Sequence, residues 1–199
     1  FDTGFMVFNL VTYPHLNRLF RELAVPVKPT SMSFSVRHTA SGLEYCGSSL
    51  NHLFAQRRNI LRPSFLRMIA DILRFNGRSR ALLAAPDDGL TLGEYLAREG
   101  YSRAFTERYI LPMGRAIWSA SGTGMLAFPA RFFVDFFERH GFLNIDDRPT
   151  WRTVSGGSRE YARRLVAPFL DRVRLSTPVR RIVRDDAGVT LTSEGPTGL

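Results

Sequence analysis

Hydrophobic side chains recur at helical spacing near the start of the chain. Four of them fall at positions i, i+3, i+4 and i+7 and would share one face of a helix: Leu16, Leu19, Phe20 and Leu23. The helix should begin near Pro14, because proline is tolerated in a first turn, and end before Pro26. Apolar and polar residues then alternate over 32–36, which predicts a half-buried strand. After a turn at Gly42, residues 43–46 can pair back with it as a hairpin.

The middle of the chain, from about 49 to 141, is mainly helical in pattern. Thr91 followed three residues later by Glu94 is the signature of a capping box at the start of a helix. The pattern over 101–118 predicts two short helices divided at Pro112. We therefore expect several packed helices between two more extended ends.

The last quarter changes character. Residues 151–154 predict a strand, and Gly156-Gly157 predicts a turn into a helix. Short apolar runs at 173–175 and 179–183 predict further strands, and a tight turn then leads into one at 189–192. The predicted order is strand, helix, strand and hairpin, so the fold class combines helices with a smaller amount of sheet.

Composition is that of an ordinary globular protein. With 44% hydrophobic, 23% charged and 12% aromatic residues, global disorder is excluded. The single cysteine, Cys46, excludes an intramolecular disulfide and a cysteine zinc cluster. No stretch reaches the roughly 18 apolar residues of a membrane span. No histidine has a histidine or cysteine partner at metal-ligand spacing, so we assign no metal site.

The formal net charge of +9 comes from arginine, since Lys28 is the only lysine. Residues 56–80 hold seven arginines against one acid, Asp71. This stretch has three interpretations: an ordinary solvated helix face, a phosphate-binding face for nucleic acid, or a basic amphipathic surface for anionic lipid. No nucleic-acid-binding motif accompanies the charge, so we favour lipid over nucleic acid. The candidates for peripheral membrane contact are Arg57, Arg58, Arg62, Arg67 and Arg74.

Motifs at both ends and in the middle resemble the flavin amine-oxidase superfamily. Asp-Thr-Gly-Phe at 2–5 and Glu-Leu-Ala-Val at 22–25 resemble the segment that follows its Rossmann fingerprint. Val-Ser-Gly-Gly-Ser at 154–158, and the strand pattern that follows at 173–182, resemble its V-x-G-G turn, helix and strand. The middle resembles one bacterial branch, FAD-dependent oxidoreductases often found beside cyclopropane fatty-acid synthase. The residues concerned are Phe-Ala-Gln-Arg-Arg-Asn at 54–59, Leu-Pro-Met-Gly at 111–114, Ile-Trp-Ser at 117–119 and Phe-Pro-Ala-Arg-Phe-Phe at 128–133.

The resemblance implies an α+β fold, of the α/β FAD-binding type but incomplete. A mainly helical substrate domain at 30–150 would be flanked by strands of a discontinuous FAD-binding domain at 1–29 and 151–199. The Rossmann fingerprint that holds the FAD pyrophosphate should lie before Phe1, and the rest of the flavin site beyond Leu199. We therefore expect these 199 residues alone to hold FAD poorly and to be inactive.

The resemblance also implies site residues. Gly4 and Phe5 would lie against the flavin, and the backbone of Val179 would meet the adenine end of FAD. Lys28 matches no active-site lysine motif, so no catalytic residue is assigned. Candidates to line an apolar cavity, for which core packing is the ordinary alternative, are Trp118, Phe128, Phe132 and Phe136.

The predicted function is an FAD-dependent oxidoreductase that removes a hydride from an apolar, lipid-like substrate. The missing active-site lysine weakens an amine as the substrate, and the apolar helical domain with its basic surface favours a lipid. The alternative is a basic non-enzymatic module that binds a membrane surface or nucleic acid. The lone cysteine is in keeping with a reducing cytosol, so we expect a cytoplasmic protein peripheral to the inner membrane.

Overall fold

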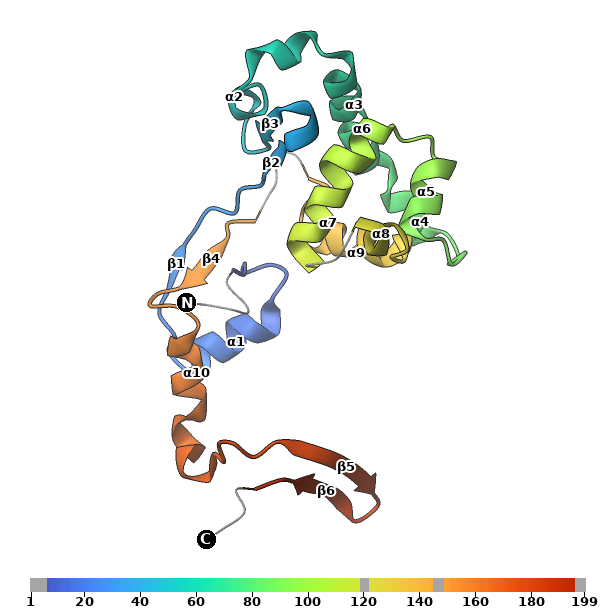
Figure 1. Ribbon diagram of the computed structural model, residues 1–199. Helices are drawn as coiled ribbons and strands as arrows, with labels where there is room; N and C mark the ends of the chain where they lie inside the picture. Colours follow the sequence, from blue (N-terminus) through green and yellow to red (C-terminus); the bar gives the residue numbers. More distant parts are fainter. Residues whose placement is uncertain (1–6, 119–121, 145–148, 196–199) are drawn as a thin grey trace.

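The computed structural model describes residues 7–118, 122–144 and 149–195. A helical body occupies the upper part of Figure 1, and the two ends of the chain build the lower part. The helices are α1 (Pro14–Glu22), α2 (Leu50–Leu53), α3 (Pro63–Arg78), α4 (Arg80–Ala84), α5 (Leu92–Arg98), α6 (Arg103–Phe105), α7 (Leu111–Trp118), α8 (Gly122–Leu126), α9 (Ala130–Arg139) and α10 (Arg159–Val166). Shorter helical turns are η1 (Thr39–Ser41), η2 (Arg57–Leu61), η3 (Thr106–Ile110) and η4 (Ala167–Arg172).

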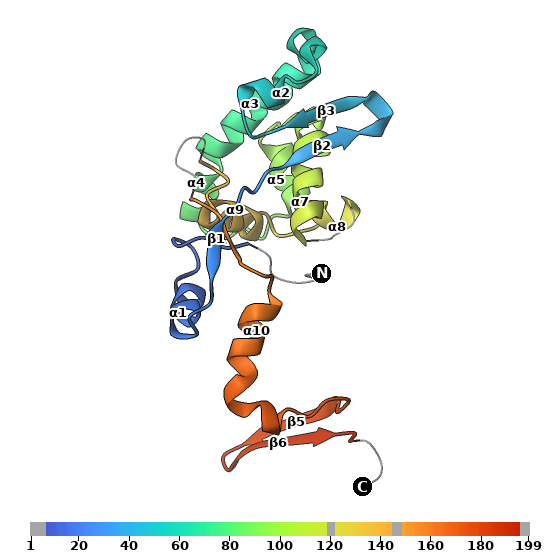
Figure 2. The same cartoon turned by 90° about the vertical axis from the view of Figure 1, so that its left-hand side faces the viewer.

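The strands form antiparallel pairs, and one pair joins segments far apart in the sequence. They are β1 (Val27–Pro29), β2 (Ser35–His38), β3 (Leu43–Cys46), β4 (Arg152–Val154), β5 (Val179–Asp185) and β6 (Gly188–Ser193). The β2–β3 and β5–β6 pairs are local hairpins, whereas β1 pairs with β4. Arg152 of β4 also exchanges backbone hydrogen bonds of 3.0 and 2.7 Å with Phe8. The strand β4 therefore lies between β1 and the segment around Phe8. The helical body is the connection between β1 and β4, which lie side by side in Figure 1, and Figure 2 shows the helices of this body above β1.

Two apolar cores follow from this arrangement. In the helical body, the buried ring of Phe75 contacts five aromatic rings at centroid distances of 5.6–6.4 Å: Tyr95, Tyr101, Phe105, Phe133 and Phe137. A smaller core of Phe8, Phe20, Val25 and Val154 holds α1 against the β1–β4 pair. Phe8 meets Phe20 edge-on at 5.1 Å. The body and the joined ends thus each have apolar packing of their own.

Several predicted elements are confirmed, α1 and the two hairpins among them. In the predicted capping box, Glu94 N–H donates to Thr91 Oγ1 at 3.3 Å, and Thr91 N–H donates to Glu94 Oε2 at 2.9 Å. The strand predicted at 32–36 begins only at Ser35, the residue that pairs with Cys46. The strand predicted at 173–175 does not form, because no described strand pairs with it.

The prediction of two helices divided at Pro112 is wrong. The segment from Arg103 to Trp118 is one continuous helical run through α6, η3 and α7. The turn before Pro112, η3, is a π-helix. A wider turn leaves room for the proline ring and tolerates its missing N–H, so the helix continues where an α-helical turn would have broken.

The end of α1 is a Schellman motif with an unusual residue in it. Val25 N–H donates to Phe20 O at 2.8 Å and Ala24 N–H donates to Arg21 O at 3.1 Å, the two bonds that define the motif. Ala24 has φ +49°, a left-handed conformation that favours glycine. The helix end is therefore well bonded but carries backbone strain at Ala24.

Substitution Ala24→Gly should raise the free energy of unfolding by about 1 kcal/mol, because glycine adopts a positive φ without a Cβ clash. Gly141, at φ +71°, ends α9 in the same way. The control Gly141→Ala should be destabilising, since its Cβ would come within 3.0 Å of Pro149 Cδ. Urea unfolding measures both changes, and a less stable Ala24→Gly variant would contradict the assignment of strain.

The buried carboxylate of Asp71 holds α3 against the start of α6. Its side chain is only 2% exposed. Ser102 N–H donates to Asp71 Oδ2 at 3.0 Å, and Arg74 Nη2 donates to Oδ1 at 2.9 Å. Burial alone would raise the pKa of Asp71, but the hydrogen bonds from Ser102 and the charges of Arg67 and Arg74 outweigh burial and lower it. Asp71 is therefore ionised and part of the structure of the body.

Substitution Asp71→Asn should cost about 2 kcal/mol of unfolding free energy, because Arg74 then loses its carboxylate. Because the folded pKa is lowered, the contribution of Asp71 is present above its unfolded pKa and is lost as pH falls through the folded value. The advantage of the wild type over the variant should shrink in acid. Asp88→Asn, at an exposed ion pair with Arg98, is the control and should change little. A pH-independent difference would contradict the role of the Asp71 charge.

Candidate functional site

Of the three residues expected to touch FAD, the structure describes one. Gly4 and Phe5 lie outside the described residues. Val179 begins β5, is half exposed, and pairs with Ser193. In the described part of the chain β5 pairs only with β6, so its other edge leaves backbone N–H and C=O groups for a ligand or another strand. That open edge fits the backbone contact expected of Val179, which stays a prediction.

The turn Gly156-Gly157 directs the chain from β4 into α10. Both glycines have φ +86°, and Gly157 N–H donates to Val154 O at 3.2 Å. A Cβ on Gly156 would come within 3.0 Å of Glu160 Cγ. This backbone path therefore requires glycine, in agreement with the predicted turn. It fixes where α10 leaves the β1–β4 pair, and α10 in turn leads to Val179.

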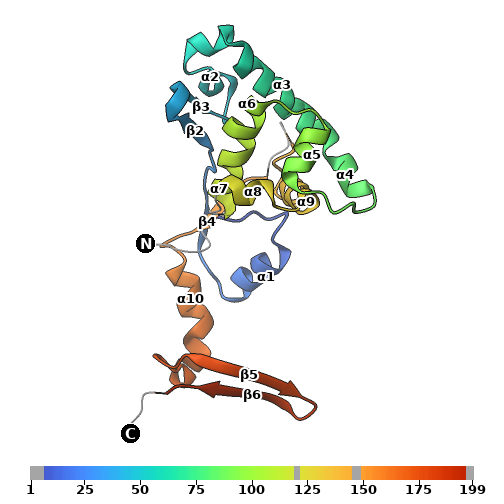
Figure 3. The same ribbon diagram turned by 45° about the vertical axis from the view of Figure 1, so that its right-hand side comes forward.

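Helix α10 is docked on the C-terminal end of α1. Arg164 Nη1 donates to Leu23 O at 3.1 Å and to Ala24 O at 2.8 Å. The ring of Tyr161 packs on Phe20 at 5.4 Å. A cation at a helix C-terminus satisfies free carbonyls and is favoured by the helix dipole. These contacts, between residues about 140 positions apart, set the direction of α10 (Figure 3).

The four aromatic residues named as cavity candidates come together in one cluster. Trp118 in α7 contacts Phe128 at 5.1 Å, Phe132 at 6.5 Å and Phe136 at 4.7 Å. Phe133 of the main core lies behind them at 5.4 Å from Trp118. Phe132 is the most open of the four, at 55% exposed. The cluster is thus an aromatic face formed by α7, α9 and the turn before α9, and it is backed by the core of the helical body.

A hydrogen bond joins this aromatic face to the N-terminal segment. His140 stacks on Phe136 at 3.8 Å, and its Nδ1 is 2.8 Å from Phe136 O. A carbonyl oxygen only accepts, so Nδ1 carries a proton and Nε2 accepts from the Tyr13 hydroxyl, 3.1 Å away. Burial raises the pKa of Tyr13, so the phenol stays protonated and donating. Sequence reasoning missed this pair, because nothing in the pattern connects two positions 127 residues apart.

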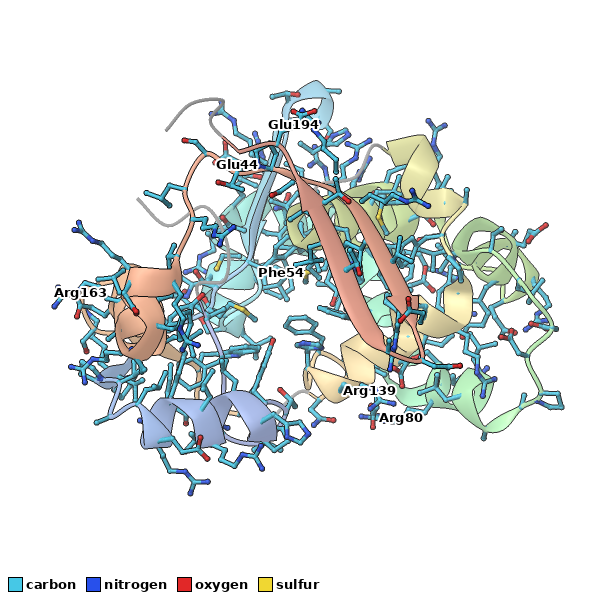
Figure 4. The ribbon with its side chains drawn as sticks, turned by 90° about the horizontal axis from the view of Figure 1, so that it is seen from below. Glu44, Phe54, Arg80, Arg139, Arg163 and Glu194 are labelled. Atoms are coloured by element: carbon cyan, nitrogen blue, oxygen red, sulfur yellow. The ribbon has the colours of Figure 1, made fainter. Side chains whose placement is uncertain are left out.

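The acids near the aromatic face are already paired. Arg139 Nε lies 2.6 Å from Asp135 Oδ2, and Arg80 Nε lies 2.7 Å from Glu138 Oε2. The two arginines are labelled in Figure 4. These pairs lie on α9 and between α4 and α9, so they also fasten α4 to the body. Both acidic residues of α9 therefore form ion pairs with arginines, and the surface beside them is aromatic.

Two cavities lie away from the aromatic face. One of about 650 Å³ lies beside α1 and is lined by apolar residues such as Phe8, Phe20 and Val25, with Asn17 and Arg21. The Oδ1 atom of Asn17 is buried without a hydrogen-bond partner. The other, of about 540 Å³, lies between α4 and α5, and its charged side chains include the ion-paired Arg98 and Asp88.

The described residues meet the requirements neither of a metal site nor of a membrane-spanning helix. No group of three His, Cys, Asp or Glu side chains in this part of the chain could hold a metal ion. None of the helices described has the length and apolar character needed to cross a membrane. Lys28 lies in β1, exposed and opposite Thr153.

A family model described as flavin containing amine oxidoreductase matches residues 1–198. The chain belongs to this family. FAD is accordingly its cofactor, as the resemblance implied. The narrower resemblance to a bacterial branch stays a prediction, and the search of curated proteins finds no match.

Solved structures of putrescine oxidase share the fold. The wild type bound to putrescine has a TM-score of 0.61 at 18% identity, covering 96% of this chain and 43% of that one. A single-site mutant has a TM-score of 0.64 at 16% identity, covering 98% and 44%. The family member described here thus spans less than half the length of these structures, and the likeness confirms the mixed FAD-binding fold class. The division into domains at 1–29, 30–150 and 151–199 stays a prediction.

Substitution Arg164→Ala should loosen α10 from α1 and lower the free energy of unfolding by about 1 kcal/mol, since two carbonyls lose a charged donor. The adjacent Arg163→Ala is the matched control, because among the described residues the ion pair of Arg163 is an exposed contact of 3.8 Å with Glu160. Hydrogen exchange in α10 reports the docking directly. Equal exchange in both variants would contradict the role assigned to Arg164.

Proposed function

We propose that this chain is part of an FAD-dependent oxidoreductase that takes a hydride from an apolar, lipid-like substrate. The observation that carries the proposal is the aromatic face of Trp118, Phe128, Phe132 and Phe136. His140 attaches this face to Tyr13, in the N-terminal segment that follows the residues expected to lie against the flavin. The family match over residues 1–198 supports the cofactor. The substrate class rests on the chemistry of the face.

The FAD would be held at least in part by the open edge of β5 at Val179, and by residues 2–5 according to the family resemblance. When bound, FAD supplies the hydride acceptor. The residues of this chain have supporting roles. The aromatic face binds apolar substrate and excludes water, and the Tyr13–His140 hydrogen bond holds that face against the N-terminal segment.

The paired acids favour an apolar substrate over an amine. A diamine carries two positive charges, and cation–π contacts with aromatic rings recover only part of the hydration that it loses, so free carboxylates would be needed beside the rings. On α9, Asp135 and Glu138 are neutralised by Arg139 and Arg80. What remains on the aromatic face is hydrocarbon surface, which gains most by burying another hydrocarbon surface.

Anaerobic reduction of bound FAD tests the substrate class. In the holoenzyme, long-chain acyl or polyene lipids should bleach the flavin band, and putrescine should not. Phe132→Ala should slow reduction at low substrate concentration by about tenfold, because a partly open aromatic contact is lost. The control Phe169→Ala, at a 37% exposed phenylalanine in η4, should change the rate little.

If putrescine reduces the flavin and the lipids do not, the proposal of an apolar substrate is contradicted, while the proposal of a flavin oxidoreductase stands. A folded protein, expressed with its complete coding sequence, that carries no flavin and takes up none when FAD is supplied would contradict the oxidoreductase itself.

A further inference from the structure

One end of the helical body carries exposed aliphatic side chains. They lie on α2, on η2 and on the first turn of α3: Leu50, Ile60, Leu61 and Leu66. Leu61 is 87% exposed, so almost all of its side chain faces solvent. Leaving several large aliphatic side chains in water on neighbouring elements is costly, and such patches mark interaction sites. We call this surface, with its arginines, the η2 tip.

The arginines beside these side chains have neutral hydrogen-bond partners among the described residues. Arg57 donates to Asn51 Oδ1 at 2.6 Å and to Phe54 O at 3.1 Å. Arg58 donates to Gly42 O at 3.1 Å. These partners are neutral, and no carboxylate among the described residues lies within ion-pair distance of either arginine. The only acid between positions 45 and 86 is the buried Asp71. The exposed surface of this stretch is therefore purely basic.

The η2 tip is held in place by hydrogen bonds to the β2–β3 hairpin. Gln56 Nε2 donates to Gly42 O at 3.0 Å, and Gln56 Oε1 accepts from Glu44 N–H at 3.1 Å. Asn59, inside η2, is fully buried. Ile60 and Leu61 are thus presented by a bonded turn, which costs little further conformational entropy on binding.

The η2 tip lies at the opposite end of the molecule from the β5–β6 hairpin in Figures 1, 2 and 3. The hairpin has exposed apolar side chains of its own, such as Ile182 and Leu191, and offers open strand edges. The surfaces that an FAD-binding domain would need are therefore at the far end. A cofactor domain that adds strands to this hairpin would contact the molecule away from the η2 tip.

We propose that the η2 tip docks this protein on a bilayer that contains anionic phospholipid. Ile60 and Leu61 enter the apolar boundary of the headgroup layer, and Arg57 and Arg58 meet the phosphates, as in interfacial amphipathic elements. A second copy of the chain is a poorer occupant, because it would bring like-charged arginines together. An acidic protein would match the charge but gives no role to an exposed Leu61.

Vesicle sedimentation with the full chain tests the docking without involving flavin. Vesicles containing phosphatidylglycerol should bind the protein, and phosphatidylcholine vesicles should not. Leu61→Ser should weaken binding by about tenfold, since one leucine no longer leaves water. The control Leu175→Ser replaces a leucine that is 81% exposed outside the tip, and should leave binding unchanged. High salt should weaken the wild type by screening the arginines.

Three results would overturn the proposal. They are equal binding to both kinds of vesicle, equal binding by the two serine variants, and no binding at all. A dimer in light scattering that Leu61→Ser dissolves would assign the η2 tip to self-association instead. Ile60→Ser repeats the test at the adjacent exposed side chain, and circular dichroism of each variant shows whether the fold is retained.

Discussion

The backbone pairing of β4 with β1 and with Phe8 is the contact on which the rest of the structure depends. Arg152 exchanges two backbone hydrogen bonds with Phe8 on one side and lies opposite Pro29 in the β1 register on the other. The adjacent Trp151 O accepts from Thr30 N–H at 2.8 Å, so β4 is hydrogen-bonded on both edges. This pairing closes a connection of more than a hundred residues, which is entropically costly. The small core around Phe20 and the docking of α10 by Arg164 compensate for that cost. Together they hold two distant segments, α1 with β1 and β4 with α10, in one unit from which the helical body extends. We call this unit the platform.

The platform connects the edge expected to contact FAD with the aromatic face proposed to bind substrate. On its outer side, the glycine turn and α10 lead to the open edge of β5 at Val179. On its inner side, the Tyr13–His140 hydrogen bond joins it to the aromatic face of α7 and α9. Flavin chemistry needs a substrate carbon held close to the cofactor and shielded from water. The Tyr13–His140 hydrogen bond holds the platform and the aromatic face together, as the proposed chemistry requires. The basic η2 tip lies at the other end of the body.

Local signals predicted local structure well. The Thr91 capping box, the Gly156-Gly157 turn and the β2–β3 hairpin are each specified within a few residues, and each formed as expected. The continuous helix through Pro112 was missed, because a π-helical turn compensates for proline in a way that periodicity does not reveal. The Tyr13–His140 bond and the Arg164 contacts depend on tertiary proximity alone. The cofactor prediction came from family motifs and not from periodicity or charge.

The absorbance spectrum of the purified protein, expressed with its complete coding sequence, tests the central claim most directly. The spectrum should show the visible bands of a bound flavin at about one FAD per polypeptide. These bands should bleach when an apolar substrate is added in the absence of oxygen. A folded protein that carries no flavin, and that takes up none when FAD is supplied, would contradict it.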